Sequence, residues 1–132
     1  MTTRRKFLQL SALTSALGVL LPSSAKASTK SNSPIVVSTW EHGLPANAAA
    51  WNVLSSGGLA IDAVEAGVRI PEADPDVRTV GYGGYPDSEG NVTLDACIMD
   101  ENMNCGSVAY LQGIKHPISV ARRVMDKTPH VM

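Results

Sequence analysis

Three histidines and Trp40, one of the two tryptophans, are the side chains that the sequence singles out for catalysis or ligand contact. His42, His116 and His130 are scattered, and none lies beside a nucleophile motif such as Gly-x-Ser-x-Gly. His42 follows Trp40 closely at the end of an apolar stretch, a favourable place for a ligand contact, but a lone histidine is more typical of an ordinary loop. Trp40 fits either a core anchor or the wall of a ligand pocket, and its spacing favours the core. The residues alone form no complete catalytic set.

Two further segments have the composition of ion-binding loops without the matching pattern. The run Gly81-Tyr-Gly-Gly84 is followed by neither a helix nor a Lys-Ser/Thr pair, so it favours a tight backbone turn over a phosphate site. Its glycines would also let the backbone approach a ligand or another segment closely. The acidic run from Glu72 to Asp76 lacks the full calcium-loop pattern and is interpreted as a solvated loop. The sequence predicts no metal site and no cofactor.

The first 27 residues have the order of a secretory signal. The twin arginine Arg4-Arg5 precedes an apolar run over residues 8–21, and the small residues Ala25 and Ala27 fit a signal peptidase. The run is shorter than the roughly 20 residues of a membrane span, although an uncleaved N-terminal anchor is the alternative. We therefore expect a twin-arginine signal over 1–27, a flexible lead-in over 28–33 and a periplasmic or secreted protein without a stable membrane span.

Removal of this signal would leave an acidic chain. The full sequence has 11 basic and 12 acidic side chains, and four of the basic ones lie in residues 1–27, which leaves a net charge of −5 for the rest. The basic cluster that remains is Arg122-Arg123, and phosphate backbones need a larger concentration of Lys and Arg. Nucleic acid is therefore not expected as a partner. The remaining length suits one domain with a modest core.

Helix and strand signals alternate along residues 34–132. Pro45 and the alanines after it predict a helix that Gly57-Gly58 ends, and a second helix from Ala60 is expected to end near Pro71. Pro117 opens a third helix. Strands are predicted over residues 35–40, 79–82, 92–99 and 106–111, the first of them buried between layers. The order indicates an α+β chain of packed sheet and helix layers.

The predicted hairpin carries one acidic side chain and the two cysteines of the chain. Asp95 falls within a strand, where a carboxylate must be paired or hydrogen-bonded, and holding a loop in place is favoured over acid–base work. Cys97 and Cys105 lie on either side of the polar turn. Export permits a disulfide between them, but the sequence does not show whether they face each other, and two buried free thiols are favoured at least as much.

Several segments taken in order carry a resemblance that no single one of them would. They include PIVVSTW at 34–40, VGYGG at 80–84, LDACIMD at 94–100 and HPISVAR at 116–122, with further matches over residues 58–69, 106–109 and 124–132. The ordered set resembles the glycosylasparaginase family, the N4-(β-N-acetylglucosaminyl)-L-asparaginases. The resemblance covers nearly all of residues 34–132, which would be a partial α-subunit region.

The resemblance implies an N-terminal-nucleophile hydrolase with an αββα four-layer sandwich, incomplete in this chain. Such precursors cut themselves, and the new N-terminal threonine of the β-subunit attacks the amide of a glycosylated asparagine, releasing aspartate and an aminosugar. No catalytic residue of the family falls in these 132 residues. Trp40 alone is carried over, as a substrate-binding residue, while His42 stands where the family often has an aromatic side chain.

The resemblance also implies partners and leaves alternatives. The chain would need the β-subunit portion, in an αβ heterodimer that pairs further, and is expected to be inactive alone and poorly soluble or loosely folded. One alternative is a plain L-asparaginase or isoaspartyl peptidase of the same superfamily. The other is a non-catalytic, truncated secreted protein.

Overall fold

A computed structural model describes residues 33–132, of which Pro34–Met132 form one compact unit. The predicted signal peptide over 1–27 lies outside the described residues, as does all of the lead-in over 28–33 except its last residue. Within the part of the chain that is described, no helix is both long enough and apolar enough to cross a membrane.

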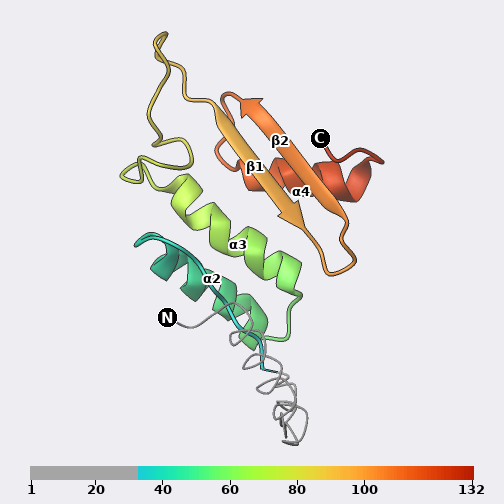
Figure 1. Cartoon of the computed structure of the whole chain (residues 1–132). Helices are drawn as coiled ribbons and strands as arrows, with labels where there is room; N and C mark the ends of the chain where they lie inside the picture. Colours follow the sequence, from blue (N-terminus) through green and yellow to red (C-terminus); the bar gives the residue numbers. More distant parts are fainter. Residues whose placement is uncertain (1–32) are drawn as a thin grey trace, which may run out of the picture. The chain divides into compact units, whose positions relative to one another are not determined.

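The described chain consists of helices packed on a β-hairpin (Figure 1). In sequence order the elements are α2 (Gly43–Ser55), α3 (Ala60–Ala73), β1 (Leu94–Met99), β2 (Cys105–Leu111) and α4 (Pro117–Lys127). The strands pair antiparallel, α4 packs against both of them, α3 contacts α4 and β1, and α2 packs on α3. The α+β class is therefore confirmed. A four-layer sandwich needs a second sheet, and residues 33–132 form one sheet of two strands.

Small residues bring α2 and α3 close together. A Cβ on Gly67 of α3 would lie 2.9 Å from the carbonyl oxygen of Ala46 and 3.3 Å from the Cβ of Ala50, both on α2. The turn between the helices uses Gly57 at φ +84°, and the Gly58 N–H donates to the carbonyl of Val53 at 2.9 Å. Glycine adopts this conformation at little cost, which confirms the predicted end of the first helix.

The core lies where α3, the hairpin and α4 meet. Ile61, Ile98, Ile118 and Ala121 are buried together, and none is more than 6% exposed. α4 approaches β2 closely because Gly106 has no side chain, and a Cβ there would collide with the backbone of Ala121 and Met125. Ile118 and Ala121 lie three residues apart in α4 and therefore face the core together.

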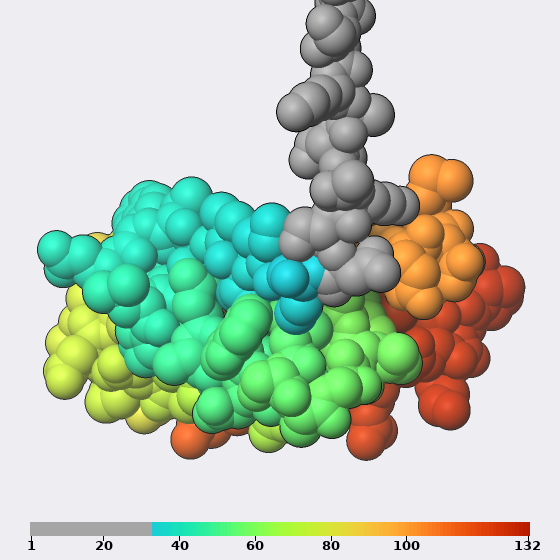
Figure 2. Space-filling model, turned by 90° about the horizontal axis from the view of Figure 1, so that it is seen from below, coloured from blue at the N-terminus to red at the C-terminus, as the bar shows by residue number. Residues whose placement is uncertain are grey.

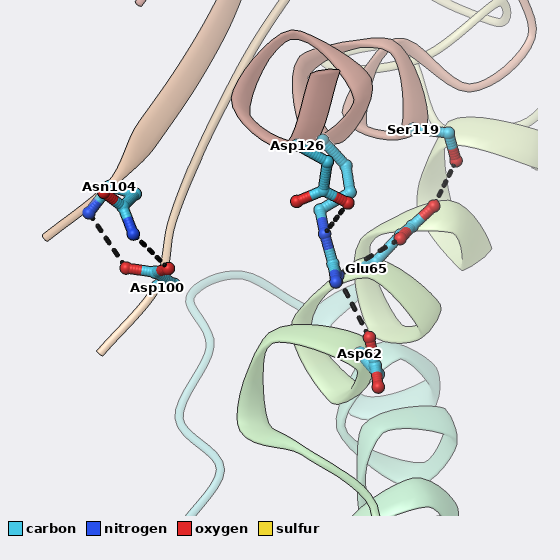
Figure 3. Close-up of polar contacts among 7 residues, drawn as sticks. Asp62, Glu65, Asp100, Asn104, Ser119 and Asp126 are labelled. Atoms are coloured by element: carbon cyan, nitrogen blue, oxygen red, sulfur yellow. Dashed lines mark hydrogen bonds and ion pairs between the residues drawn. The ribbon is translucent and has the colours of Figure 1, made fainter. Parts of the chain in front are cut away.

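Polar contacts fasten α3 to α4 at the surface (Figure 3). The hydroxyl of Ser119 donates to Glu65 at 2.6 Å, and Arg122 donates to Asp62 at 3.0 Å. Arg122 also donates to Asp126 at 2.9 Å within α4, which holds its guanidinium in place. Because these pairs are partly solvated, each adds less than about 1 kcal/mol to the free energy of unfolding. Their main effect is to fix how the two helices lie against each other.

The structure of the hairpin shows what Asp95 bonds to and whether the two cysteines form a disulfide. The Asp95 carboxylate accepts the backbone N–H of Tyr110 at 2.8 Å, where an irregularity interrupts the strand pairing. Asp95 is exposed, and its role is to hold the chain in place, as predicted. Cys97 is opposite Ser107 and Cys105 is opposite Met99, so the two cysteines are offset along the strands and both are free thiols. Cys97 is exposed and Cys105 is half-buried, so the expectation that free thiols would be buried is wrong.

The polar turn between the strands is held by one carboxylate. Asp100 accepts the backbone N–H of Asn102 at 2.9 Å. It also accepts the backbone N–H of Asn104 at 2.8 Å, and the Asn104 side chain donates to its second oxygen at 2.8 Å (Figure 3). The hydrogen bond from the Asn104 side chain is the main reason that the pKa of Asp100 lies below its usual value. The charged form of the Asp100 side chain thus stabilises the turn.

Two predicted strands are absent from the structure. Residues 34–39 are irregular, with Ile35 81% and Val37 85% exposed, so the expectation of a strand buried between layers is wrong for this structure. A strand forms only beside another strand, and none of the described residues pairs with this segment. Figure 2 shows the segment, in cyan, at the surface beside the green helices. Residues 79–82 form bends and turns in place of the second predicted strand.

Candidate functional site

A cavity of about 600 Å³ lies where the start of α2, the end of α3, β1 and the start of α4 meet. Polar side chains contribute to its wall, namely Ser38, Thr39, His42, Glu72, Thr79, Thr93 and Asp95. The buried Ile118 and Pro117 contribute apolar surface. A concave site with a few polar groups on an apolar wall is typical of small-molecule binding sites.

Trp40 stands at the rim of a neighbouring hollow of about 440 Å³. This hollow shares Thr79, Val80 and Gly81 with the larger cavity, so the two adjoin. Trp40 is 69% exposed, which corrects the interpretation of its spacing as a core position. Its backbone has φ +69°, and its carbonyl accepts the Gly43 N–H at 3.1 Å in the turn that leads into α2. The turn thus holds the indole out of the core.

His42 lies directly beside the indole. The ring centroids of Trp40 and His42 are 5.9 Å apart and the planes are inclined by 52°. His42 lines the larger cavity, while Trp40 lines the adjoining hollow. Two aromatic rings of different polarity therefore stand at the boundary of the two spaces, with an apolar face and a hydrogen-bonding edge available to a ligand.

The glycine-rich turn forms the wall that the two hollows share. Gly81 has φ +69° and packs against the backbone of Glu72 so tightly that a Cβ would collide with it. The Tyr82 N–H donates to the Glu72 carbonyl at 3.3 Å, and the Gly84 N–H donates to the Gly81 carbonyl at 3.0 Å. The predicted tight turn and close approach to another segment are confirmed.

Glu72 is the site residue that the sequence reasoning placed wrongly. The sequence predicts a solvated acidic loop at this position, but α3 continues past Pro71 to Ala73 and Glu72 is 3% exposed. One oxygen, Oε1, accepts the Ile118 N–H at the start of α4 at 3.0 Å. The signal was present, because Glu72 lies four residues after Val68, which packs against the core, and so falls on the same face of α3.

The second oxygen of Glu72 faces a histidine. Oε2 lies 3.4 Å from Nδ1 of His116, and neither buried atom has a hydrogen bond within residues 33–132. Burial raises the pKa of Glu72 to about 7, against the opposing effects of the Ile118 N–H and the positive charge of Arg69. Burial also lowers the pKa of His116, helped by the charges of Arg69 and Lys115. Both groups therefore favour their neutral forms.

Within the described residues, two of the three histidines each lie beside another candidate side chain, and the third does not. His42 meets Trp40, and His116 meets Glu72, whereas His130 is exposed and bonds through its backbone to Thr128. No serine or threonine hydroxyl of the cavity wall donates to a histidine or carboxylate in residues 33–132. In the same residues, no group of three or more His, Cys, Asp or Glu side chains is arranged to hold a metal ion.

Comparison with known proteins places the chain in a family. Residues 19–132 match the asparaginase family. The chain is 69% identical over 101 residues to an N(4)-(β-N-acetylglucosaminyl)-L-asparaginase of Elizabethkingia miricola, covering 76% of this chain and 30% of that protein. The chain belongs to the asparaginase family. The resemblance to glycosylasparaginases that the ordered motifs indicate is confirmed with it.

Other members of the asparaginase family match at lower identity. The N(4)-(β-N-acetylglucosaminyl)-L-asparaginase of Mus musculus is 49% identical over 100 residues, covering 75% of this chain and 29% of that protein. An isoaspartyl peptidase/L-asparaginase of Rattus norvegicus is 42% identical over 81 residues, covering 61% of this chain and 24% of that protein. The chain thus spans about 30% of the length of these curated relatives.

Proposed function

We propose that this chain is the N-terminal part of an amidohydrolase that cleaves N4-(β-N-acetylglucosaminyl)-L-asparagine to aspartate and an aminosugar. The observation that carries the proposal is the 69% identity over 101 residues to a protein named for that activity. The exposed Trp40 beside His42 supports it, because an indole face is a suitable surface for the apolar side of a bound substrate. Trp40 is therefore proposed as a substrate-binding residue.

The nucleophile of this proposed reaction lies outside these 132 residues. In glycosylasparaginases a threonine becomes N-terminal by self-cleavage, and its own α-amine serves as the base, so one residue provides both groups. This agrees with a cavity whose hydroxyls have no histidine or carboxylate partner within residues 33–132. The present residues would then supply part of the pocket wall, and donors elsewhere in the protein would stabilise the tetrahedral oxyanion.

The exposed apolar surface supports a larger assembly around this unit. Ile35, Val37 and Met99 are each more than 60% exposed, an unfavourable arrangement unless another layer covers them. We propose that residues 34–39 become a strand of the αββα sandwich when the β-subunit portion packs on this part. The resulting αβ heterodimer would pair further.

Turnover of three substrates by the whole protein tests the proposed activity. We expect the largest kcat/KM for glycosylasparagine, compared with asparagine and a β-aspartyl peptide, because the glycosylasparaginases are the more similar relatives. The 132-residue chain alone is the control and should show no turnover above a denatured sample. A preference for the β-aspartyl peptide or asparagine would instead favour the isoaspartyl peptidase alternative, and no turnover of any substrate would favour a non-catalytic secreted protein.

Export by the twin-arginine route is a separate proposal, based on residues 1–27. Changing Arg4 and Arg5 to lysine should stop export, because the twin-arginine signal is read as an address and not by its charge alone. The expected result is uncleaved precursor in the cytoplasmic fraction of the bacterial host, detected by immunoblotting. A variant with Lys6→Arg retains the pair and should be exported. Unchanged export of the Arg4→Lys, Arg5→Lys variant would contradict the proposal.

A further inference from the structure

Glu72 connects three parts of the molecule that are distant in sequence. Its backbone carbonyl accepts the Tyr82 N–H, and the same backbone packs against Gly81 in the glycine-rich turn. Its side chain accepts the Ile118 N–H of α4 at 3.0 Å and faces His116 at 3.4 Å. The end of α3, the wall of the cavity and the start of α4 are thus joined at one residue, which we name the Glu72 joint.

The contact between Glu72 Oε2 and His116 Nδ1 is attractive only when one of the two atoms carries a proton. Two bare lone pairs facing each other at this distance repel, and neither atom has another partner in residues 33–132. A proton on either atom converts the contact into a hydrogen bond. Burial decides which atom carries it, because a neutral carboxylic acid and a neutral imidazole avoid placing a charge on two atoms that are shielded from water.

We propose that Glu72 is a protonated carboxylic acid in the tight form of this joint, donating Oε2–H to Nδ1 of a neutral His116, and that loss of this proton loosens α4 and the cavity wall from α3. The released proton goes to solvent through the open cleft of about 670 Å³ that His116 lines between α3 and α4. His116 is the more accessible partner, with a side chain 22% exposed against 4% for Glu72.

Charged groups on each neighbouring element modulate this equilibrium. On α3, Arg69 favours the carboxylate and Glu65 opposes it, and before α4 Lys115 disfavours a charged His116. Two further titratable groups line the cavity of about 600 Å³. They are Asp95 of β1, whose carboxylate accepts the Tyr110 N–H, and His42, in the turn before α2. Residues 79–81, which line the cavity and lead into the glycine-rich turn, add no titratable group.

The sign of the pH dependence follows from which forms the fold prefers. A carboxyl with a raised pKa stabilises the fold fully below its unfolded value near 4.5, and this contribution is lost as the pH rises through about 7. His116, with a lowered pKa, contributes above its ordinary value of 6.5 and loses that contribution as the pH falls. Between pH 5 and pH 8, ionisation of Glu72 therefore weakens the joint as the pH rises. Protonation of His116 weakens the joint mainly at the acidic end of this range.

Glu72→Gln is the decisive variant because glutamine copies the protonated acid. Its carbonyl can accept the Ile118 N–H and its amide can donate to His116 Nδ1, at every pH. We expect E72Q to gain stability relative to the wild type as the pH rises. Measured in the protein as expressed from its gene, the difference in melting temperature (E72Q minus wild type) should be larger at pH 8 than at pH 5 by about 5 °C or more. The matched control, Glu89→Gln on an exposed turn, should change this difference little over the same range. An E72Q difference that is constant with pH would overturn the proposal.

A measurement on the wild type decides the proposal even if the variant fails to fold. Titration followed by NMR of the Glu72 side-chain carboxyl carbon should show a midpoint near 7, and the nitrogen shifts of His116 at pH 6 should show an unprotonated Nδ1 that accepts a hydrogen bond. A carboxyl that is already ionised at pH 6, or a His116 with a proton on Nδ1, would overturn it. These readouts report the joint itself and are independent of any hydrolase activity.

Discussion

Gly81→Ala is expected to lower the free energy of unfolding by about 2–4 kcal/mol, because the added Cβ both disfavours the backbone conformation and collides with a neighbouring segment. Gly81 has φ +69°, a conformation that costs residues with a Cβ about 1–2 kcal/mol. A Cβ would also collide with the carbonyl oxygen and Cα of Glu72, which are backbone atoms of the Glu72 joint and cannot move alone. Urea unfolding of wild type and variant at pH 6 measures the difference.

Gly90→Ala separates the two costs. Gly90 has φ +86°, but no heavy atom beyond its neighbours lies within 4 Å of the position of its Cβ. The control should therefore show the conformational cost alone, about 1–2 kcal/mol. Equal losses for the two variants would mean that the glycine-rich turn can shift away from α3, and that the shared wall of the two hollows is not fixed by this contact.

Trp40→Ala is expected to lower kcat/KM for glycosylasparagine by about 10- to 100-fold in the whole protein, if the indole binds substrate as proposed. The loss should come without unfolding, because Trp40 is 69% exposed and contributes little to the core. Steady-state kinetics and a melting curve of the same sample measure both effects. Trp40→Phe should recover part of the activity, since it restores an aromatic face.

Trp51→Ala is the matched control for this experiment. Trp51 is the other tryptophan, it lies on α2, and it is 47% exposed. It lines neither the cavity of about 600 Å³ nor the hollow at Trp40. Its removal should leave kcat/KM within about twofold of the wild type. Comparable losses of activity for Trp40→Ala and Trp51→Ala would remove the assignment of Trp40 as a substrate-binding residue.

Elements whose signals are local were predictable from the sequence. The pair Gly57-Gly58 ends α2, Pro117 opens α4, and the hairpin strands fall within two residues of the predicted bounds, because capping, turn formation and β-branched runs act over a few neighbouring residues. Asp95 is hydrogen-bonded as expected, since a strand carboxylate needs a donor.

Features that depend on distant contacts were not predictable. α3 continues two residues past Pro71, to Ala73, where the Glu72 carboxylate accepts the N–H of Ile118, a residue 46 positions later. The strand over residues 35–40 does not form, because β-branched residues need a neighbouring strand that residues 33–132 lack. The partnership of Glu72 with His116 joins two helices whose contact no short-range pattern encodes.

The last described residues determine how this sheet could grow. The carbonyl of Val131 accepts both the backbone N–H of Ser107, at 2.6 Å, and its hydroxyl, at 3.0 Å, so the chain after α4 returns to the free edge of β2. A strand continuing from Val131 would start beside the beginning of β2 and run parallel to it, with α4 as the crossover connection. β2 would then become an inner strand of a mixed sheet, with an antiparallel neighbour on one side and a parallel neighbour on the other.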